Sequence, residues 1–287
     1  MLHMKKILLL LSFLFLGISL YPQKYGLTSP DGKLTAGIEI DDGIYVALLR
    51  GRNAVIRLGN IALENSYVPE MNYGFRVQRT SDRSVDETVT PDIREKEAAY
   101  VNSYNELEIR FRGNYAITFR LFNEGLAYRF TISGKDSLRI VKENLDLYFE
   151  TGDSLRFQSS ETFNSAYETP YEHQGVQDVK SGRLISLPLL VEKTDGTFLM
   201  ITESDLYDYP GLWFRGTGES KLSAVNPPYP GSLTNTGSTY VRNQVAESLN
   251  YIAWVKGART FPWRILAVAD NEEALIGNSM VWLLASP

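Results

Sequence analysis

The sequence predicts an all-β fold, an antiparallel sandwich with at most one or two short helices. The chain of 287 residues contains 17 Tyr, 13 Phe and 4 Trp, and aromatic side chains favour strands. Short apolar or alternating segments are separated by Gly, Pro, Asn and Asp turn signals about every ten residues, a spacing typical of sandwiches. Helical periodicity is nearly absent. No fixed repeat and no Gly/Ser linker divides the body, so we expect one domain.

Three turns give the clearest local predictions. Asp42-Gly43 predicts a hairpin before a strand at 44–49. Asn123-Glu124-Gly125 predicts a tight turn between strands at 115–121 and 126–132, and Thr194-Asp195-Gly196 predicts one between 187–191 and 198–202. The remaining predicted strands lie at 34–40, 75–78, 106–111, 247–255 and 263–269.

The best helix candidate lies near the end of the chain, at residues 271–284. Asp270 is the predicted N-cap, and Glu272 and Glu273 would lie in the first turn, where acids are favourable. We expect the sandwich to cover residues 24–275. Residues 276–287 are predicted to begin a linker to a further domain, because the chain stops soon after the helical segment.

Residues 1–23 are predicted to be an export signal. Lys5 and Lys6 precede an apolar segment at 7–20, the pattern of a secretory leader. That segment is too short for a confident membrane span. We therefore expect a periplasmic or secreted protein with no membrane span.

Composition excludes several kinds of function. The chain has no Cys, which excludes disulfides, thiolate metal sites and a Cys nucleophile. Its only histidines are His3, in the leader, and His173, so a multi-histidine zinc site is not expected. The net charge is −5, with both signs spread along the chain, and this does not indicate a nucleic-acid partner.

One stretch, residues 199–212, concentrates groups that suit a binding site. After a short apolar strand come Glu203, Asp205 and Asp208, with Tyr207 and Tyr209 between them. Carboxylate oxygens suit Ca²⁺, and aromatic faces beside polar groups suit a sugar ring. If the strand continues past Glu203, Asp205 shares its face. The plain alternative is a solvated acidic loop.

Five blocks, in this order, carry a resemblance to a known family. They are SPDGK at 29–33, FRLFNEGLAYRF at 119–130, LPLLVE at 187–192, ITESDLYDYPG at 201–211 and RTFPWR at 259–264. With these blocks the chain resembles the N-terminal region of glycoside hydrolase family 97, a family of exported enzymes that act on α-glucosides or α-galactosides. The resemblance spans nearly the whole chain after the leader.

The resemblance implies a galactose-mutarotase-like β-super-sandwich that precedes a catalytic (β/α)8 barrel and a small C-terminal β domain. The family's catalytic acid and its base or nucleophile lie on the barrel, so no catalytic residue is expected in this chain. The family's Ca²⁺ is held by barrel glutamates and one sandwich glutamate, and by resemblance Glu203 has that position. The implied partners are an oligosaccharide substrate and the barrel, in cis or in trans.

Other residues have weaker signals. The loop at 161–174 contains Glu172 and His173 beside aromatic residues, and it is predicted either to line the rim of a sugar cleft or to be an ordinary surface loop. In the segment 259–264, Trp263 is expected in the core, with the arginines paired to acids at a domain interface.

Two other functions stay open. A stand-alone carbohydrate-binding module would use Tyr207, Tyr209 and Tyr171 for stacking. A sugar epimerase of the mutarotase type needs histidine together with a glutamate base. His173 is the only histidine after the leader, so this reading ranks last.

Overall fold

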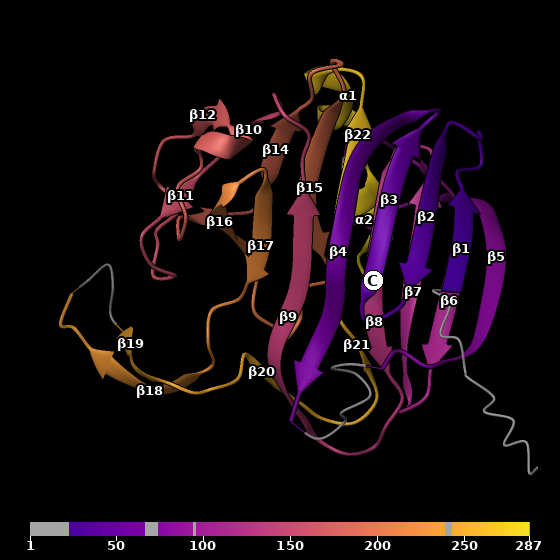
Figure 1. Cartoon of the computed structure of the whole chain (residues 1–287). Helices are drawn as coiled ribbons and strands as arrows, with labels where there is room; N and C mark the ends of the chain where they lie inside the picture. Colours follow the sequence, from indigo (N-terminus) through magenta and orange to yellow (C-terminus); the bar gives the residue numbers. More distant parts are fainter. Residues whose placement is uncertain (1–22, 67–73, 94–95, 239–242, 287) are drawn as a thin grey trace, which may run out of the picture.

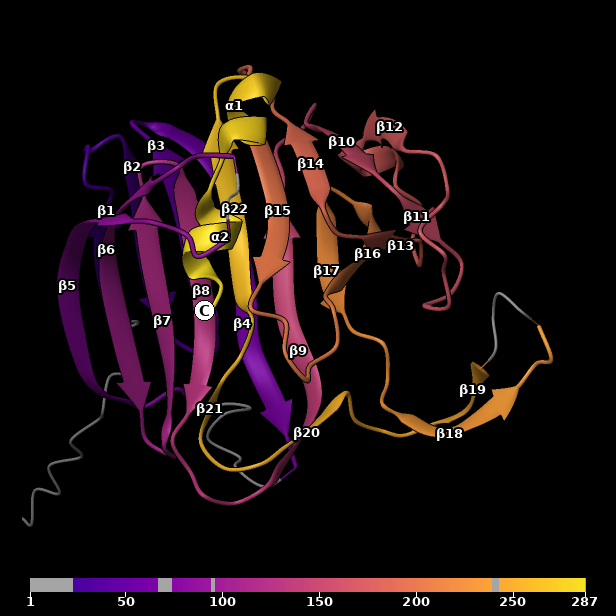
Figure 2. The same cartoon turned by 180° about the vertical axis from the view of Figure 1, so that it is seen from behind.

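Two large antiparallel sheets lie face to face and form a sandwich (Figures 1 and 2). The computed structural model describes residues 23–66, 74–93, 96–238 and 243–286. The all-β antiparallel sandwich predicted from the sequence is confirmed. Residues 1–22 of the predicted leader lie outside the described residues, and Gln23 is the first residue of a strand.

Sheet A contains most of the N-terminal strands. In spatial order its strands are β1 (Gln23–Thr28), β2 (Leu34–Ile40), β3 (Ile44–Arg50), β4 (Asn53–Asn65), β9 (Leu138–Tyr148), β17 (Lys221–Val225), β16 (Trp213–Glu219), β13 (Leu184–Ser186) and β11 (Ser159–Ser160), and β20 (Ala253–Val255) also pairs with β9. The predicted hairpin at Asp42-Gly43 is confirmed as the β2–β3 connection, with Ile40 opposite Ile44.

Sheet B forms the other layer. In spatial order its strands are β12 (Glu172–Gly175), β10 (Ser154–Phe157), β14 (Leu189–Glu192), β15 (Phe198–Ser204), β22 (Trp263–Ala269), β8 (Gly125–Ile132), β7 (Tyr115–Phe122), β6 (Tyr100–Phe111) and β5 (Val77–Val89), and β21 (Arg259–Thr260) also pairs with β8. A 3-10 turn, η2 (Val176–Asp178), follows β12. The predicted turns before residues 126 and 198 are both confirmed as hairpin connections, β7–β8 and β14–β15.

A separate two-stranded hairpin projects from the sandwich (Figure 1). It consists of β18 (Pro230–Asn235) and β19 (Asn243–Ser248). The prediction of one strand over residues 247–255 is therefore wrong. The chain leaves the hairpin at Ser248 and re-enters sheet A only at Ala253, where it pairs with β9.

The main core lies between the two sheets, where the inward residues of both layers meet. In β2 and β3 buried residues alternate with more exposed ones, because one face of each strand packs inward. In β22 all seven residues are buried. Its outward residues Trp263, Ile265 and Ala267 belong to a second apolar cluster on the outer face of sheet B.

Two short helices cover that second cluster (Figure 2). They are α1 (Glu272–Gly277) and α2 (Met280–Leu284), so the single helix predicted over 271–284 is wrong. Asn278 has an extended backbone that interrupts the helix. The predicted cap is wrong as well, because the side chain of Asn271 accepts the hydrogen bond from the Ala274 N–H at 2.8 Å, while Asp270 pairs with Arg50.

The predicted domain boundary at residue 275 falls inside α1. After it, Met280 and Leu284 are buried against β22, so this segment packs on the sandwich. None of the helices in the described residues is both long and apolar enough to cross a membrane.

Candidate functional site

A buried arginine between two glutamates forms the centre of the candidate site. Glu203, at the end of β15, lies opposite Arg264 of β22 in the strand register, and the two side chains form an ion pair. The same guanidinium donates two hydrogen bonds, of 2.7 and 2.6 Å, to Glu143 on β9. Because β9 belongs to sheet A, Arg264 links the two layers of the sandwich.

The electrostatics of this cluster follow from its burial. Burial raises the pKa of Glu203, and Arg264 and the Leu212 N–H offset only part of that shift. Burial alone would lower the pKa of Arg264, but Glu143 and Glu203 raise it above its ordinary value, so the guanidinium stays charged. One cation therefore faces two carboxyl groups.

Two buried tyrosines complete the surroundings of the cluster. Burial and the nearby Glu143 raise the pKa of both Tyr128 and Tyr209. Neither phenolic oxygen has a hydrogen-bond partner among the described residues. Unpaired buried hydroxyls are costly, so this end of the inter-sheet space is polar but incompletely satisfied.

The two oxygens of Glu203 are in different situations. Oε2 accepts the Leu212 N–H at 3.1 Å and the bond from Arg264. Oε1 makes no hydrogen bond within the described part of the chain, and the side chain is 16% exposed. Glu203 can therefore offer one oxygen to a cation. Ca²⁺ takes 6–8 oxygens, and no group of three or more acidic or histidine side chains able to hold a metal gathers among the described residues. Glu203 thus fits Ca²⁺ as one ligand and not as a whole site.

The neighbouring acids do not join Glu203. The strand ends at Ser204, and Asp205 has a left-handed backbone with φ of 61°. Its carboxylate instead accepts the Ser286 N–H at 3.1 Å and lies 3.5 Å from Arg129. Asp205 would share a face with Glu203 only in a continuing strand, and that condition is not met because the chain turns there. Asp208, also left-handed with φ of 48°, is exposed.

The two tyrosines of this segment differ sharply. Tyr207 is 63% exposed, as a stacking residue must be. Tyr209 is only 8% exposed, and its ring packs edge-on against Phe261 at 5.3 Å between centroids. The structure therefore gives Tyr209 a packing position instead of the open ring face that its predicted stacking role needs.

The predicted rim loop approaches Glu203 through an aromatic residue. Tyr167 is exposed, its ring lies 5.5 Å from that of Trp213, and the charge of Glu203 contributes after burial to a raised pKa of Tyr167. Phe163 packs edge-on against the same Trp213 at 5.7 Å. Residues 161–174 thus fold over the start of β16, beside the end of β15.

The two polar residues predicted in that loop lie further along it, in β12. Glu172 pairs with Arg183 at 2.7 Å and accepts a bond from Ser159; burial alone would raise its pKa, but these two partners hold it below the ordinary value. His173 is half-exposed and lies 3.1 Å from the Ser154 hydroxyl and 3.4 Å from Glu192. Neither contacts Glu203.

Sequence reasoning missed Glu143 altogether and misplaced Arg264. The segment 259–264 indicated a core tryptophan, and Trp263 is indeed buried, with Arg120 and Arg129 over its ring at 4.7 and 4.3 Å. Arg264 pairs with acids as expected, but inside the sandwich and not at a surface. The available signal was a single arginine inside an otherwise apolar strand, Trp263–Ala269.

Comparison with known proteins shows which family has this architecture. A family model described as Glycosyl-hydrolase 97 N-terminal matches residues 27–287. The chain is 35% identical over 300 residues to a retaining alpha-galactosidase of Bacteroides thetaiotaomicron, and the match covers 99% of this chain and 44% of that protein. The chain thus spans less than half the length of this relative.

Solved structures show the same fold. A glycoside hydrolase family 97 enzyme of Pseudoalteromonas sp. strain K8, in complex with acarbose, superimposes with a TM-score of 0.76 at 17% identity, over 92% of this chain and 38% of that one. A beta-arabinopyranosidase gives 0.70 at 16% identity, over 86% and 40%. The two-sheet sandwich is therefore of the kind found as one part of larger glycoside hydrolases. This chain belongs to glycoside hydrolase family 97 and corresponds to its N-terminal domain.

Proposed function

We propose that this sandwich supplies Glu203 as one ligand of a Ca²⁺ whose other ligands lie on a catalytic (β/α)8 barrel, in an exported enzyme acting on α-galactosides or α-glucosides. The observation that carries the proposal is the asymmetry of Glu203. Arg264 and the Leu212 N–H hold Oε2, and Oε1 is left without a hydrogen bond among the described residues. Such a carboxylate is oriented but keeps one oxygen for a cation.

The same geometry supports an accessory role for the chain. Hydrolysis of a glycosidic bond needs two carboxyl groups placed across it, about 5–10 Å apart. Glu143 is buried and both of its oxygens accept hydrogen bonds from Arg264, so a substrate cannot lie between Glu143 and Glu203. We assign the acid and the base or nucleophile to the barrel. When bound, Ca²⁺ would supply charge stabilisation near the substrate.

An exposed apolar surface supports docking of the barrel on the outer side of sheet B. This helix-side surface consists of the exposed residues Leu206, Tyr207 and Trp282. Two hydrogen bonds join its parts: the Ser204 hydroxyl donates to the Val281 carbonyl at 2.6 Å, and the Ser286 N–H donates to Asp205 at 3.1 Å. Grouped exposed apolar residues are typical of an interface. Tyr167, and further along the same loop Glu172 and His173, would form the cleft rim beside it.

The location outside the cytoplasm also stays a proposal, and it rests on the leader-like residues 1–23. A fusion of those residues to a reporter enzyme that is active only after export would test it. The reporter should be active with the leader and inactive when Lys5 and Lys6 are both replaced by Glu, since the positive segment starts export.

Calcium titration by calorimetry tests the shared site. The chain is titrated alone and mixed with a family 97 catalytic barrel. We expect weak or no binding by the chain alone, and tight binding with the barrel that Glu203→Gln abolishes. The matched control is Glu172→Gln, an acid paired with Arg183 and without contact to Glu203, which should leave calcium binding unchanged. Equal calcium affinity in wild type and Glu203→Gln would overturn the proposal.

A stand-alone carbohydrate-binding module is the second candidate, because Tyr207 and Tyr171 are both strongly exposed. It predicts saccharide binding by the chain without any barrel, lost in Tyr207→Ala. If such binding occurs and calcium binding never does, this second function replaces the first.

A further inference from the structure

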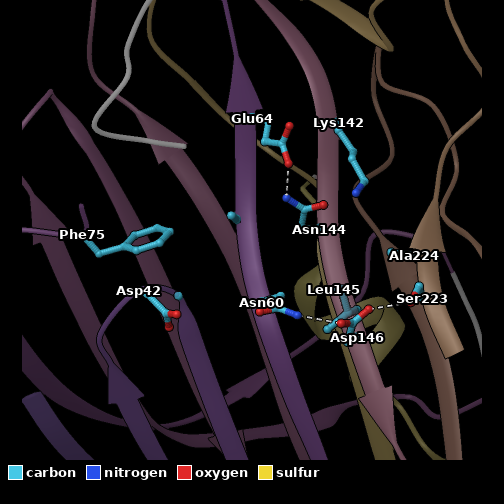
Figure 3. A pocket seen from close by; sticks show the side chains of 12 residues that line it. Asp42, Asn60, Glu64, Phe75, Lys142, Asn144, Leu145, Asp146, Ser223 and Ala224 are labelled. Atoms are coloured by element: carbon cyan, nitrogen blue, oxygen red, sulfur yellow. Dashed lines mark hydrogen bonds between the residues drawn. The ribbon is translucent and has the colours of Figure 1, made fainter. Parts of the chain in front are cut away.

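The outer face of sheet A carries a polar hollow of about 440 Å³ over β4, β9 and β17 (Figure 3). It is on the opposite sheet from Glu203, and the Ca²⁺ proposal makes no use of it. Its polar lining comes from Asp42, Asn60, Glu64, Lys142, Asn144, Asp146 and Ser223. These are amide, hydroxyl, ammonium and carboxylate groups, and all of them except Asp42 lie on the strands β4, β9 and β17.

An irregularity in β4 builds one side of the hollow. The pairing of β4 with β9 shifts register between Gly59 and Ala62, and Asn60 at that shift has a left-handed backbone with φ of 55°. The bulge turns the Asn60 amide toward β9, where it donates to Asp146 at 2.7 Å. The Ser223 hydroxyl donates to the other oxygen of Asp146 at 2.6 Å. Figure 3 shows these three side chains joined across the three strands.

The upper part of the hollow keeps unpaired groups. Asn144 donates to Glu64 at 2.6 Å, which orients both side chains. The Asn144 carbonyl, the second Glu64 oxygen and the Lys142 ammonium have no hydrogen bond or ion pair within the described ranges. Figure 3 shows these side chains close together at one end of the hollow. Oriented acceptors thus lie next to a free donor.

Two tyrosines separate this hollow from a second one of about 320 Å³. Tyr45 donates to Asp42 at 2.9 Å and lies 3.3 Å from Asn60, and Tyr148 donates to Asp146 at 3.4 Å. Their rings pack over Gly59, where a Cβ would lie 2.9 Å from Tyr148 and 3.2 Å from Tyr45. Because Gly59 has no side chain, the rings of Tyr45 and Tyr148 can both pack against its backbone.

The second hollow has an open floor and an aromatic wall. Gly37 and Ala47 lie opposite each other in the β2–β3 register and line it, and a Cβ added to Gly37 would meet nothing within 4 Å. Tyr148 is 38% exposed at its edge. The two hollows and the tyrosine pair form one continuous strip, which we name the sheet A strip.

This chemistry selects a class of ligand. Three carboxylates, from Asp42, Glu64 and Asp146, line the polar hollow and disfavour an anion. A metal cation is disfavoured because the Lys142 ammonium lies in the same hollow and no group of three or more acidic or histidine side chains able to hold a metal gathers among the described residues. A sugar hydroxyl both donates and accepts, and the C–H face of a sugar ring stacks on an aromatic ring. No histidine lines either hollow, so epimerase chemistry has no imidazole here.

We propose that the sheet A strip binds a short neutral oligosaccharide, with Asn144 and Lys142 contacting hydroxyls in one hollow and Tyr148 stacking a second ring. The proposal is independent of Ca²⁺ and of the barrel. It predicts that the chain alone binds saccharide weakly, in the millimolar range, because the strip is open and shallow.

The test is ligand-observed saturation-transfer NMR on the purified chain with melibiose and with maltotriose, followed by titration. At least one probe should give signals, and Tyr148→Ala should weaken binding at least fivefold. Gly37→Phe, which fills the second hollow without touching a hydrogen bond, should do the same. Thermal melting of each variant checks that the fold is kept. The matched control, Tyr229→Ala, removes a tyrosine of similar exposure that lines neither hollow, and it should leave affinity unchanged. Tyr207→Ala tests whether the saccharide instead binds beside Glu203.

Four outcomes would overturn the proposal. The first is no saturation transfer with either probe at tens of millimolar. The second is unchanged affinity in both Tyr148→Ala and Gly37→Phe. The third is loss of binding in Tyr207→Ala alone, which would place the saccharide beside Glu203. Binding lost in Glu203→Gln or dependent on Ca²⁺ would also count against the strip, and it would leave the calcium proposal standing.

Discussion

Arg264 on β22 pairs with Glu203 on the adjacent strand and with Glu143 on the opposite sheet, so one buried guanidinium joins the layers of the sandwich to the carboxylate of the candidate site. This arrangement couples stability to function. The hydrogen bonds that hold the Arg264 guanidinium in place also hold the Oε2 atom of Glu203. The buried Glu143 pair holds Arg264, and through it Glu203, in place, and its contribution to the fold can be measured as stability.

Arg264→Met should destabilise the fold by about 3–5 kcal/mol, because it leaves two carboxyl groups buried without their cation. Urea unfolding followed by circular dichroism measures the loss. Arg264→Lys should lie between wild type and Met, since lysine keeps the charge but lacks the planar fork that meets Glu143 at two points.

The matched control is Arg259→Met. Arg259 donates to the carbonyls of Tyr207 and Asp208 at 2.9 and 3.4 Å near the surface, and its loss should cost about 1 kcal/mol. Equal losses of unfolding free energy in Arg264→Met and Arg259→Met would mean that the buried cluster contributes no more to stability than a surface arginine.

Tyr209→Phe should be neutral or stabilise the protein by up to about 1 kcal/mol, because the hydroxyl is buried without a partner among the described residues. Tyr128→Phe should behave in the same way. Tyr45→Phe is the contrast, since its hydroxyl donates to Asp42 at 2.9 Å and its removal should cost about 1 kcal/mol. A clear loss of stability in Tyr209→Phe would instead reveal a hydrogen bond to the nearby Glu143.

Glu106 gives a pH-dependent prediction. It accepts bonds from Arg83 at 2.6 Å and from Arg120 at 2.7 Å on the neighbouring strands. Burial alone would raise its pKa, but the two arginines lower it below the ordinary value of 4.5. A carboxyl whose folded pKa is lowered stabilises the fold above its unfolded pKa, and this contribution is lost as pH falls through the folded pKa.

The stability difference between wild type and Glu106→Gln should therefore be largest above pH 4.5 and shrink as the pH falls toward about 3. Urea midpoints between about pH 6 and about pH 3 measure it. The control, Glu108→Gln, removes a more exposed partner of Arg110 and should give a small difference throughout. A difference for Glu106→Gln that does not vary with pH would contradict the assignment.

The sequence predicted those parts of the fold that have local signals. The hairpins at Asp42-Gly43 and Thr194-Asp195-Gly196 are short turn dipeptides and tripeptides between apolar segments, and each formed where expected. Most of β5 escaped prediction because it is an edge strand with nearly all side chains exposed, and so it has no apolar alternation to read.

The candidate site was predictable only in part. Glu203 stood out because acids cluster after an apolar strand, but the left-handed turn at Asp205 that separates these acids has no marker such as glycine. Glu143 lies 121 residues from Arg264 and meets it only across the sheets. Contacts of this kind depend on how the layers pack, and no spacing along the chain encodes them.

Gly125 belongs to a local turn motif, but the requirement for glycine there comes from a tertiary contact with β22. The turn Asn123-Glu124-Gly125 forms as predicted, but Gly125 has φ of 149°, and a Cβ there would lie 2.1 Å from the Leu266 carbonyl oxygen of β22. Gly125→Ala should therefore cost at least about 3 kcal/mol, since the backbone of β22 has to move. Thermal and urea unfolding measure the loss.

Gly32→Ala is the matched control for this last prediction, because Gly32 also has positive φ, at 75°, but open space around the missing Cβ. It pays only for the left-handed backbone, about 1–2 kcal/mol. The excess loss in Gly125→Ala then reports the close approach of β8 to β22, the strand that holds Arg264, together with a φ that lies further from the left-handed region. If both variants lose the same stability, backbone conformation alone explains Gly125 and the contact with β22 contributes nothing.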